Sequence, residues 1–280
     1  VHTVFDLERI NSEAENQQTW QIWDLDGQTV AASFSSQGKG SDHSGWELTF
    51  LAERVPALGY RCFWVCPGDQ VARPVEASQS VVGAIGDRQT LENEFLRVVV
   101  DPASGDLASV FDKINQRQVL SGAGNQLQAF RDEGQYWDAW NIDPNYESQP
   151  LSASELVPTP DLKGTGARFH NALVDQIQVQ RRIGQSVFTQ TYILERGSPL
   201  LKIETSIDWQ ERHVLVKAAF PLNLEADCAT YETPAGVIQR PTQPESDREK
   251  AQWEVPAMQW ADLGDDTYGV SLLNDCKYGY

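Results

Sequence analysis

Aromatic rings and carboxylates are interleaved in the stretch QYWDAWNIDPNYE, residues 135–147. Sugar sites need this mixture, because an aromatic face packs on the apolar C–H patch of a pyranose ring while a carboxylate accepts hydrogen bonds from its hydroxyls. The candidate binding residues are Tyr136, Trp137, Asp138, Trp140, Asp143 and Tyr146. The alternative is a buried aromatic knot, since tryptophans in β-sandwiches are usually core and an Asp beside a Pro is usually a turn.

Three later stretches also bring polar side chains together. The first, SIDWQERHVLVKAAFP, contains Asp208, Glu211, His213 and Lys217 on a predicted strand. An acid near a histidine can do acid/base chemistry, although the same residues are also typical of a satisfied polar pair.

The second stretch, ATYETPAGVIQRPT, places Glu232, Gly236 and Arg240 around a turn. Arg240 could clamp a carboxylate or stack on an aromatic ring, and the alternative is an exposed loop. The third, NDCKYGY, offers hydrogen-bonding capacity at a predicted strand end through Asn274, Asp275, Lys277 and Tyr278. No residue of these stretches is predicted to be catalytic.

The net charge of the chain limits the classes of partner that we expect. Its 280 residues contain 40 acidic and 22 basic side chains, which gives a formal net charge of -18. Such a surface repels a phosphate backbone and an anionic membrane, so neither nucleic acid nor a membrane is an expected partner. No stretch approaches the roughly 20 apolar residues of a spanning helix, and the start VHTVFDLERI lacks the pattern of a signal peptide.

The cysteines and histidines do not have the spacing of a local zinc site, which usually shows Cys-x-x-Cys, His-x-His or His-Glu-x-x-His. Reduced core thiols are expected, and alternation would place Cys62 and Cys66 on one face of a strand. We therefore expect no metal to be held by this chain alone. Neither of the common glycine-rich phosphate-binding motifs is present, so nucleotide binding is not indicated.

The elements that must position these residues are mainly β-strands, because short β-branched and aromatic runs alternate with turn residues at close intervals. We predict a small β-sandwich over residues 1–75, a linker over 76–89 and a large antiparallel β-sandwich over 90–280. The clearest hairpin is LRVVVDPASGDLASVFDK, where Pro102 suits the second turn position and Gly105 can take a positive φ.

Six motifs in order resemble the C-terminal β-domain of family 38 α-mannosidases. They are LENEFLRVVVDPASGDLASVFDK, GNQLQAFRDEGQYWDAWNID, IDWQERHVLVKAAFP, ATYETPAGVIQRPT, WEVPAMQWADL and YGVSLLNDCKYGY. The closest likeness is to the branch of cytosolic and vacuolar enzymes, where a Trp-Asp-Ala-Trp-Asp motif is typical. The final Asp of that motif is Asn141 here.

The resemblance implies that residues 90–280 form a galactose-mutarotase-like supersandwich, truncated at its C-terminus. It also implies that the zinc ion, the nucleophile and the general acid belong to an N-terminal catalytic barrel absent from this chain. No cofactor is therefore expected in the chain itself. The isolated chain is expected to be inactive, although it is part of a retaining glycosidase whose partners are an α-mannoside and the barrel.

Two functions of different classes follow. The chain is either the noncatalytic portion of an α-mannosidase, completing its substrate cleft, or an autonomous carbohydrate-binding or mutarotase-like module. The second would need His213 or His170 beside Glu211 for acid/base chemistry. The unpaired cysteines and the lack of an Asn-x-Ser/Thr acceptor predict a cytoplasmic location.

Overall fold

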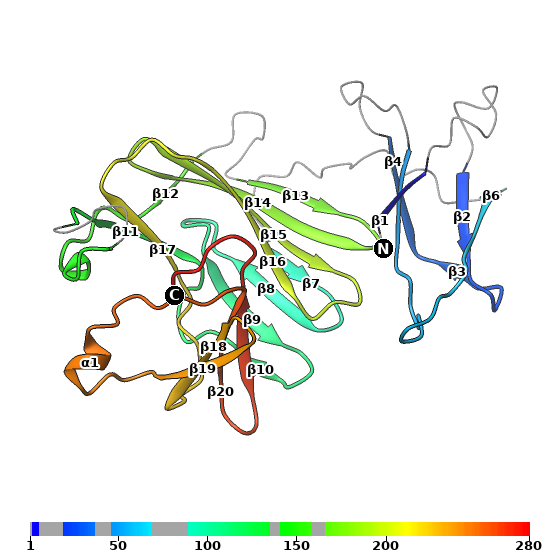
Figure 1. Cartoon of the computed structure of the whole chain (residues 1–280). Helices are drawn as coiled ribbons and strands as arrows, with labels where there is room; N and C mark the ends of the chain where they lie inside the picture. Colours follow the sequence, from blue (N-terminus) through cyan, green and yellow to red (C-terminus); the bar gives the residue numbers. More distant parts are fainter. Residues whose placement is uncertain (1, 6–18, 37–45, 69–88, 135–140, 158–165) are drawn as a thin grey trace. The chain divides into compact units, whose positions relative to one another are not determined.

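In a computed structural model, the regular secondary structure of the described residues is almost entirely antiparallel β-sheet (Figure 1). The structure describes residues 2–5, 19–36, 46–68, 89–134, 141–157 and 166–280. The all-β prediction is confirmed.

Two three-stranded sheets form the N-terminal part, in the strand orders β1–β5–β4 and β3–β2–β6. Their strands are β1 (His2–Phe5), β5 (Trp46–Phe50), β4 (Ala32–Ser36), β3 (Thr29–Val30), β2 (Thr19–Trp23) and β6 (Trp64–Gly68). Ile22 of the second sheet packs with Leu48 and Phe50 of the first in one buried cluster. The two sheets are therefore a sandwich with an apolar interior, as the alternation in the sequence predicts.

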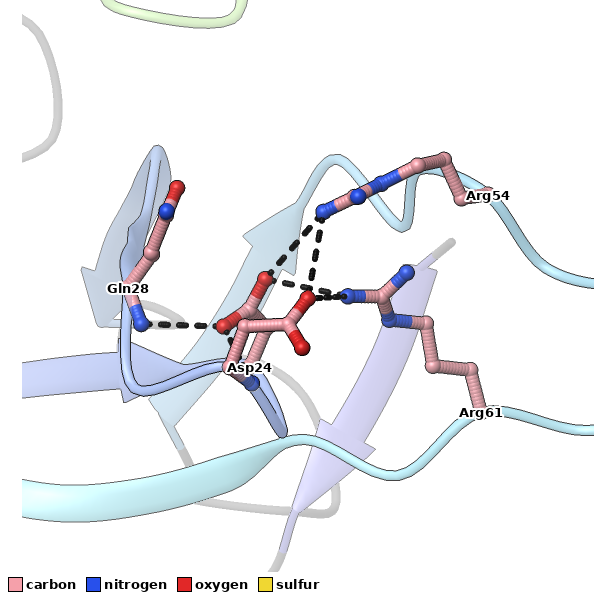
Figure 2. A network of polar contacts seen from close by, with 5 residues as sticks. Asp24, Gln28, Arg54 and Arg61 are labelled. Atoms are coloured by element: carbon pink, nitrogen blue, oxygen red, sulfur yellow. Dashed lines mark hydrogen bonds and ion pairs between the residues drawn. The ribbon is translucent and has the colours of Figure 1, made fainter.

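A polar network closes the turn between β2 and β3 (Figure 2). Oδ1 of Asp24 accepts hydrogen bonds from the backbone N–H groups of Asp26 and Gln28, both at 2.9 Å. Oδ2 accepts from Nη2 of Arg61 at 3.0 Å, and Arg54 lies 3.6 Å away. Gly27 takes a φ of 72°, the left-handed conformation that the Asp-Gly pair predicts. The buried carboxylate thus organises the turn and ties it to the loop that carries both arginines.

Four further sheets form the rest of the chain (Figure 1), in the orders β10–β9–β8–β7, β12–β14–β15–β16 with β13 paired to β14, β11–β17, and β19–β18–β20–β21. Their strands are β7 (Thr90–Glu92), β8 (Leu96–Val100), β9 (Leu107–Asp112), β10 (Arg117–Gln118), β11 (Gln126–Arg131), β12 (Glu155–Leu156), β13 (Gly166–His170), β14 (Val174–Ile183), β15 (Ser186–Glu195), β16 (Leu201–Asp208), β17 (Val214–Ala219), β18 (Cys228–Thr233), β19 (Gly236–Pro241), β20 (Trp260–Gly264) and β21 (Gly269–Leu273).

Two short helical turns accompany these sheets: the 3-10 helix η2 (Tyr146–Ser148) and the α-helix α1 (Asp247–Lys250). Ser246 and Glu249 cap the start of α1 reciprocally, which satisfies backbone N–H groups that a short helix leaves open.

The predicted hairpin is present between β8 and β9. The backbone N–H groups of Asp101 and Gly105 donate to the carbonyls of Asp106 and Asp101, each at 2.8 Å. Gly105 adopts a φ of 78°, as the turn chemistry predicts. The turn places Asp106 on the buried side of the strands.

The buried face of β14 carries a fully buried arginine. Ile177, Val179 and Ile183 alternate inward along the strand, and the same alternation buries Arg181 completely, with 0% exposure. Its Nη1 pairs with Oδ1 of Asp106 at 2.5 Å, and both terminal nitrogens donate to the carbonyl of Asn125 at 3.0 Å. Burial raises the pKa of the Asp106 carboxyl, while the positive charge of Arg181 acts in the opposite direction.

The chain forms two compact units, each made of several stretches. The first contains Val1–Leu96, Val157–Gln180 and Thr189–Ser206, and the second contains the remaining residues. Most of the expected linker, 76–89, lies outside the described residues, so the boundaries 1–75 and 90–280 stay a prediction.

All four cysteines are free, but they are not core residues. Cys62, Cys228 and Cys276 are exposed, and Cys66 is half-buried. Cys62 precedes the start of β6, so the expectation that it shares a strand face with Cys66 was wrong. Cys62 belongs to the loop before β6, in which Nη2 of Arg61 donates a hydrogen bond to Oδ2 of Asp24. Regular strand pairing begins only at Trp64.

Replacing Asp24 with Asn should lower the melting temperature at neutral pH. The pKa of this carboxyl is lowered mainly by the backbone N–H of Gln28, with Asp26, Arg61 and Arg54 adding to the effect against burial. A depressed pKa in the folded state gives stability that is present above the unfolded pKa and lost as pH falls through the folded one. Thermal unfolding should therefore show a gap between wild type and variant at pH 7 that closes in acid.

Asp26→Asn is the matched control, because this neighbouring carboxylate is more than half exposed and should matter less. An equal gap at pH 7 and in acid would show that the Asp24 charge is not what stabilises the turn.

Replacing Arg181 with Met should lower the free energy of unfolding by about 3 to 5 kcal/mol, because it leaves the Asp106 carboxylate without its partner. The pKa of Asp106 rises further in this variant, so the loss should shrink as pH falls and the carboxyl takes up a proton. Urea unfolding at two pH values measures both effects. Arg182→Met in the exposed neighbouring position is the control, and equal losses from the two substitutions would contradict the role of the buried pair.

Candidate functional site

The described part of the aromatic stretch begins at Asn141, which is exposed. Tyr136, Trp137, Asp138 and Trp140 lie outside the described residues, so their contact with sugar stays a prediction.

Asp143 closes the turn that leads into η2. Its backbone N–H donates to Oδ1 of Asp132 at 2.8 Å, and its own Oδ1 accepts from the N–H of Asn145 at 2.9 Å. Its Oδ2 accepts from Nε2 of Gln149 at 3.3 Å. Both oxygens of this buried carboxylate therefore bind within the turn, which fixes the segment that follows the aromatic motif.

Tyr146 is a buried anchor with 1% exposure. Its ring meets Phe130 of β11 edge to face, with centroids 5.1 Å apart. Its hydroxyl accepts a hydrogen bond from the ammonium of Lys217 on β17 and donates to Oε1 of Glu147 at 3.0 Å. This part of the stretch matches the aromatic-knot alternative, because the ring is core and the hydroxyl satisfies a cation and a carboxylate.

Arg240 stacks on an aromatic ring, which is one of the two roles that the sequence suggested. Its guanidinium carbon lies 4.7 Å from the ring centroid of Tyr231 on β18, and Nη1 donates to the carbonyl of Pro256 at 3.4 Å. The Tyr231 ring in turn meets Tyr280 edge to face at 6.2 Å. Stacking fixes the guanidinium plane and so its donor directions.

The C-terminal stretch is organised by Asn274. Its Oδ1 accepts from the backbone N–H groups of Cys276 and Lys277 at 3.1 and 3.0 Å, and its own N–H donates to the carbonyl of Gln259. Asp275, Lys277 and Tyr278 are exposed beyond this turn. The stretch thus presents a carboxylate, an ammonium and a phenol to solvent from a fixed backbone.

The site residues form two groups, held by different elements. Asp143 and Tyr146 are held by the loop after β11 and by β17. Arg240 and the C-terminal stretch are both hydrogen-bonded to residues 255–259. Arg240 donates to the carbonyl of Pro256. The N–H of Ala257 donates to the carbonyl of Tyr278, and the N–H of Asn274 donates to the carbonyl of Gln259.

Glu211 and His170 have structural partners of their own. Oε1 of Glu211 accepts from the backbone N–H of Gln185 at 2.6 Å, next to Gly184, where any Cβ would collide with the carboxylate. Nδ1 of His170 lies 3.4 Å from Oδ1 of Asp175. Glu211 therefore stabilises the β14–β15 turn, which accounts for it without acid/base chemistry.

The described ranges contain neither a metal-binding cluster nor a membrane-spanning helix. There, no three His, Cys, Asp or Glu side chains gather as a metal ion would require. No helix in this part of the chain has the length and apolar character to cross a membrane.

Sequence reasoning missed a hollow of about 390 Å3 on the sheet β19–β18–β20–β21. Its lining is Thr230, Trp260, Asp262, Ser271 and Leu273. The alternation in QWADL does place Trp260 and Asp262 on one strand face, but the other residues come from two more strands. Only the pairing of those strands reveals the hollow.

Comparison with known proteins gives a consistent result. Residues 91–280 match the family described as the glycosyl hydrolases family 38 C-terminal domain. The chain is 33% identical to Alpha-mannosidase 2C1 of Homo sapiens over 230 residues, covering 80% of the chain and 21% of the human protein. It is also 33% identical to Alpha-mannosidase G of Dictyostelium discoideum over 199 residues, covering 68% of the chain and 18% of that protein.

The chain therefore spans about a fifth of the length of these relatives. Among solved structures, an alpha-mannosidase from Enterococcus faecalis V583 resembles 94% of the chain with a TM-score of 0.60 and 14% identity, over 33% of its own length. That likeness concerns the fold alone. Since the sequence match spans residues 91–280, more than half of the chain, the chain belongs to the family of glycosyl hydrolases family 38 C-terminal domains.

Proposed function

We propose that the chain is the noncatalytic β-domain portion of an α-mannosidase, a retaining glycoside hydrolase, and that it helps to complete the substrate cleft. The observation that carries the proposal is the family match over residues 91–280, together with relatives named as α-mannosidases. An α-mannoside and a separate catalytic barrel are the partners that this function requires.

The group around residues 255–259 is suited to contact sugar. Arg240 has a fixed guanidinium plane, and Asp275, Lys277 and Tyr278 are exposed on a backbone fixed by Asn274. Charged donors and acceptors of this kind bind sugar hydroxyls, and an exposed ring can cover a pyranose face. Trp137 and Asp138 are proposed to join them from the aromatic stretch.

The outer strands of the same sheet fit a contact with another domain. Ile238 on β19 and Leu272 on β21 are 42% and 41% exposed, and alternation places them on the face that carries Arg240. Exposed apolar side chains of this size support the proposed contact with the barrel.

In a retaining glycosidase two carboxylates act as nucleophile and general acid through a covalent glycosyl intermediate, and both are assigned here to the barrel. Zinc, when bound, would hold sugar hydroxyls and polarise them. The described residues provide no ligand set for such an ion. The part proposed for this chain is to bind and orient the sugar.

A cytoplasmic location is part of the proposal. The four free cysteines support it, because disulfides are rare in that compartment. The net charge of -18 also supports the absence of nucleic acid among its partners.

The purified 280-residue chain should not hydrolyse an aryl α-mannoside, with or without added zinc. The expected result is a rate equal to the buffer control, from a sample whose circular dichroism shows a folded β-protein. Hydrolysis that depends on zinc would mean that the chain holds a complete active site, and would overturn the noncatalytic role.

In an α-mannosidase that carries this sequence, Tyr278→Ala should lower kcat/KM about tenfold, which corresponds to about 1.4 kcal/mol of lost binding to the transition state. Tyr278 is 69% exposed, so the substitution removes a ring without opening a cavity. Zinc content should be unchanged. Tyr60→Ala, which removes an even more exposed ring from the first unit, is the matched control. Wild-type kinetics in both variants would exclude Tyr278 from the cleft.

A further inference from the structure

One face of the sheet β19–β18–β20–β21 has two adjoining rows of side chains across its strands. In the first row, Thr230 of β18 pairs with Asp262 of β20, which pairs with Ser271 of β21. In the next row, Trp260 of β20 pairs with Leu273 of β21. The register thus places a hydroxyl, a carboxylate and a second hydroxyl beside an indole ring.

These five residues line the hollow of about 390 Å3. The hollow is shallow and largely open to solvent, so a ligand would bind on the sheet surface. The lining contains no Lys or Arg, and the chain carries a net charge of -18. An anionic ligand would therefore be repelled, whereas a neutral ligand with hydroxyl donors would not be.

The carboxylate is oriented by its neighbours. Oγ of Ser271 donates to Oδ2 of Asp262 at 2.6 Å. On the same face of the sheet, the next paired positions are Gly264 and Gly269. A Cβ at these positions would lie 3.4 Å from Oδ1 and 3.7 Å from Oδ2 of Asp262. The two glycines therefore leave the far side of the carboxylate uncovered, although glycine weakens a strand.

Indole and carboxylate have complementary functions toward one class of ligand. The indole face packs on the C–H patch of a pyranose, and the two carboxylate oxygens accept from adjacent ring hydroxyls. Thr230 and Ser271 can donate or accept, and Leu273 extends the apolar wall.

We propose that this hollow is a binding site for the pyranose ring of a neutral glycan, on the sheet face opposite to Arg240. Its identification as a mannose site rests on the proposed function, whereas the binding of a pyranose follows from the lining alone. Such a site would give the chain a second contact with a glycan, remote in sequence from the aromatic stretch.

The test is a titration of the 15N-tryptophan-labelled chain with methyl α-D-mannopyranoside, followed by NMR of the indole N–H groups. The chain has nine tryptophans, and the Trp260 signal is assigned by its loss in Trp260→Phe. The Trp260 signal should shift and saturate with a millimolar Kd. No shift of this signal with the mannoside, the glucoside or the galactoside would overturn the site.

Asp262→Asn keeps the shape of the side chain but removes its charge, and should weaken binding at least fivefold. Trp260→Ala should abolish binding, measured by saturation transfer from protein to sugar. Trp253→Ala, at an exposed tryptophan outside the lining, should leave the Kd unchanged. Unchanged affinity in a folded Asp262→Asn variant would overturn the proposal.

The stereoisomeric sugars separate this proposal from the proposed function. Binding of the galactoside but not the mannoside would support a pyranose site and count against mannose as its ligand. Binding of the mannoside by a chain that also hydrolyses aryl α-mannosides would support the site while overturning the noncatalytic role.

Discussion

The second unit depends on one buried charge. A guanidinium stays charged at every accessible pH, so Arg181, with no exposed surface, requires its partners to be in place when β14 packs. Asp106 comes from the β8–β9 turn and the acceptor carbonyl from Asn125, which is itself buried and has a φ of 52°. Three segments distant in sequence are thereby held to one arrangement, and an alternative register would leave the charge without partners.

Polar side chains also organise three of the described turns. Asp24 organises the β2–β3 turn, Asp143 the approach to η2, and Asn274 the backbone after β21. Each accepts backbone N–H groups that no strand partner satisfies. Alternating apolar residues stabilise the strands. The irregular segments that carry the candidate site residues are instead stabilised by local hydrogen bonds to side-chain carboxylates and amides. The geometry of the site therefore depends on these side chains more than on the core.

The sheet β19–β18–β20–β21 has two chemically different faces, and each of the two proposals uses one of them. Alternation directs Arg240 and Tyr231 to one face, and Trp260 and Asp262 to the other. One face combines a stacked guanidinium with exposed apolar side chains, which suits contact with a protein domain and its substrate. The other combines an indole with an oriented carboxylate, which suits a neutral sugar. The two proposals are thus compatible, because they use opposite faces of the same strands.

The sequence by itself determined the all-β class and the β8–β9 hairpin, because alternation and Asp-Pro or Asp-Gly turn chemistry are local. It also determined the family, since its motifs occur in order along the chain. The partners of Asp143 and Tyr146 were decided only by the tertiary structure. The sequence around Tyr146 is the same whether its hydroxyl binds Lys217 or solvent, so the sequence cannot distinguish the two. The partners of Arg181 and the hollow around Asp262 were likewise decided only by the tertiary structure. Thr230, Asp262 and Ser271 become neighbours only through the register of three strands, and that register is set by packing.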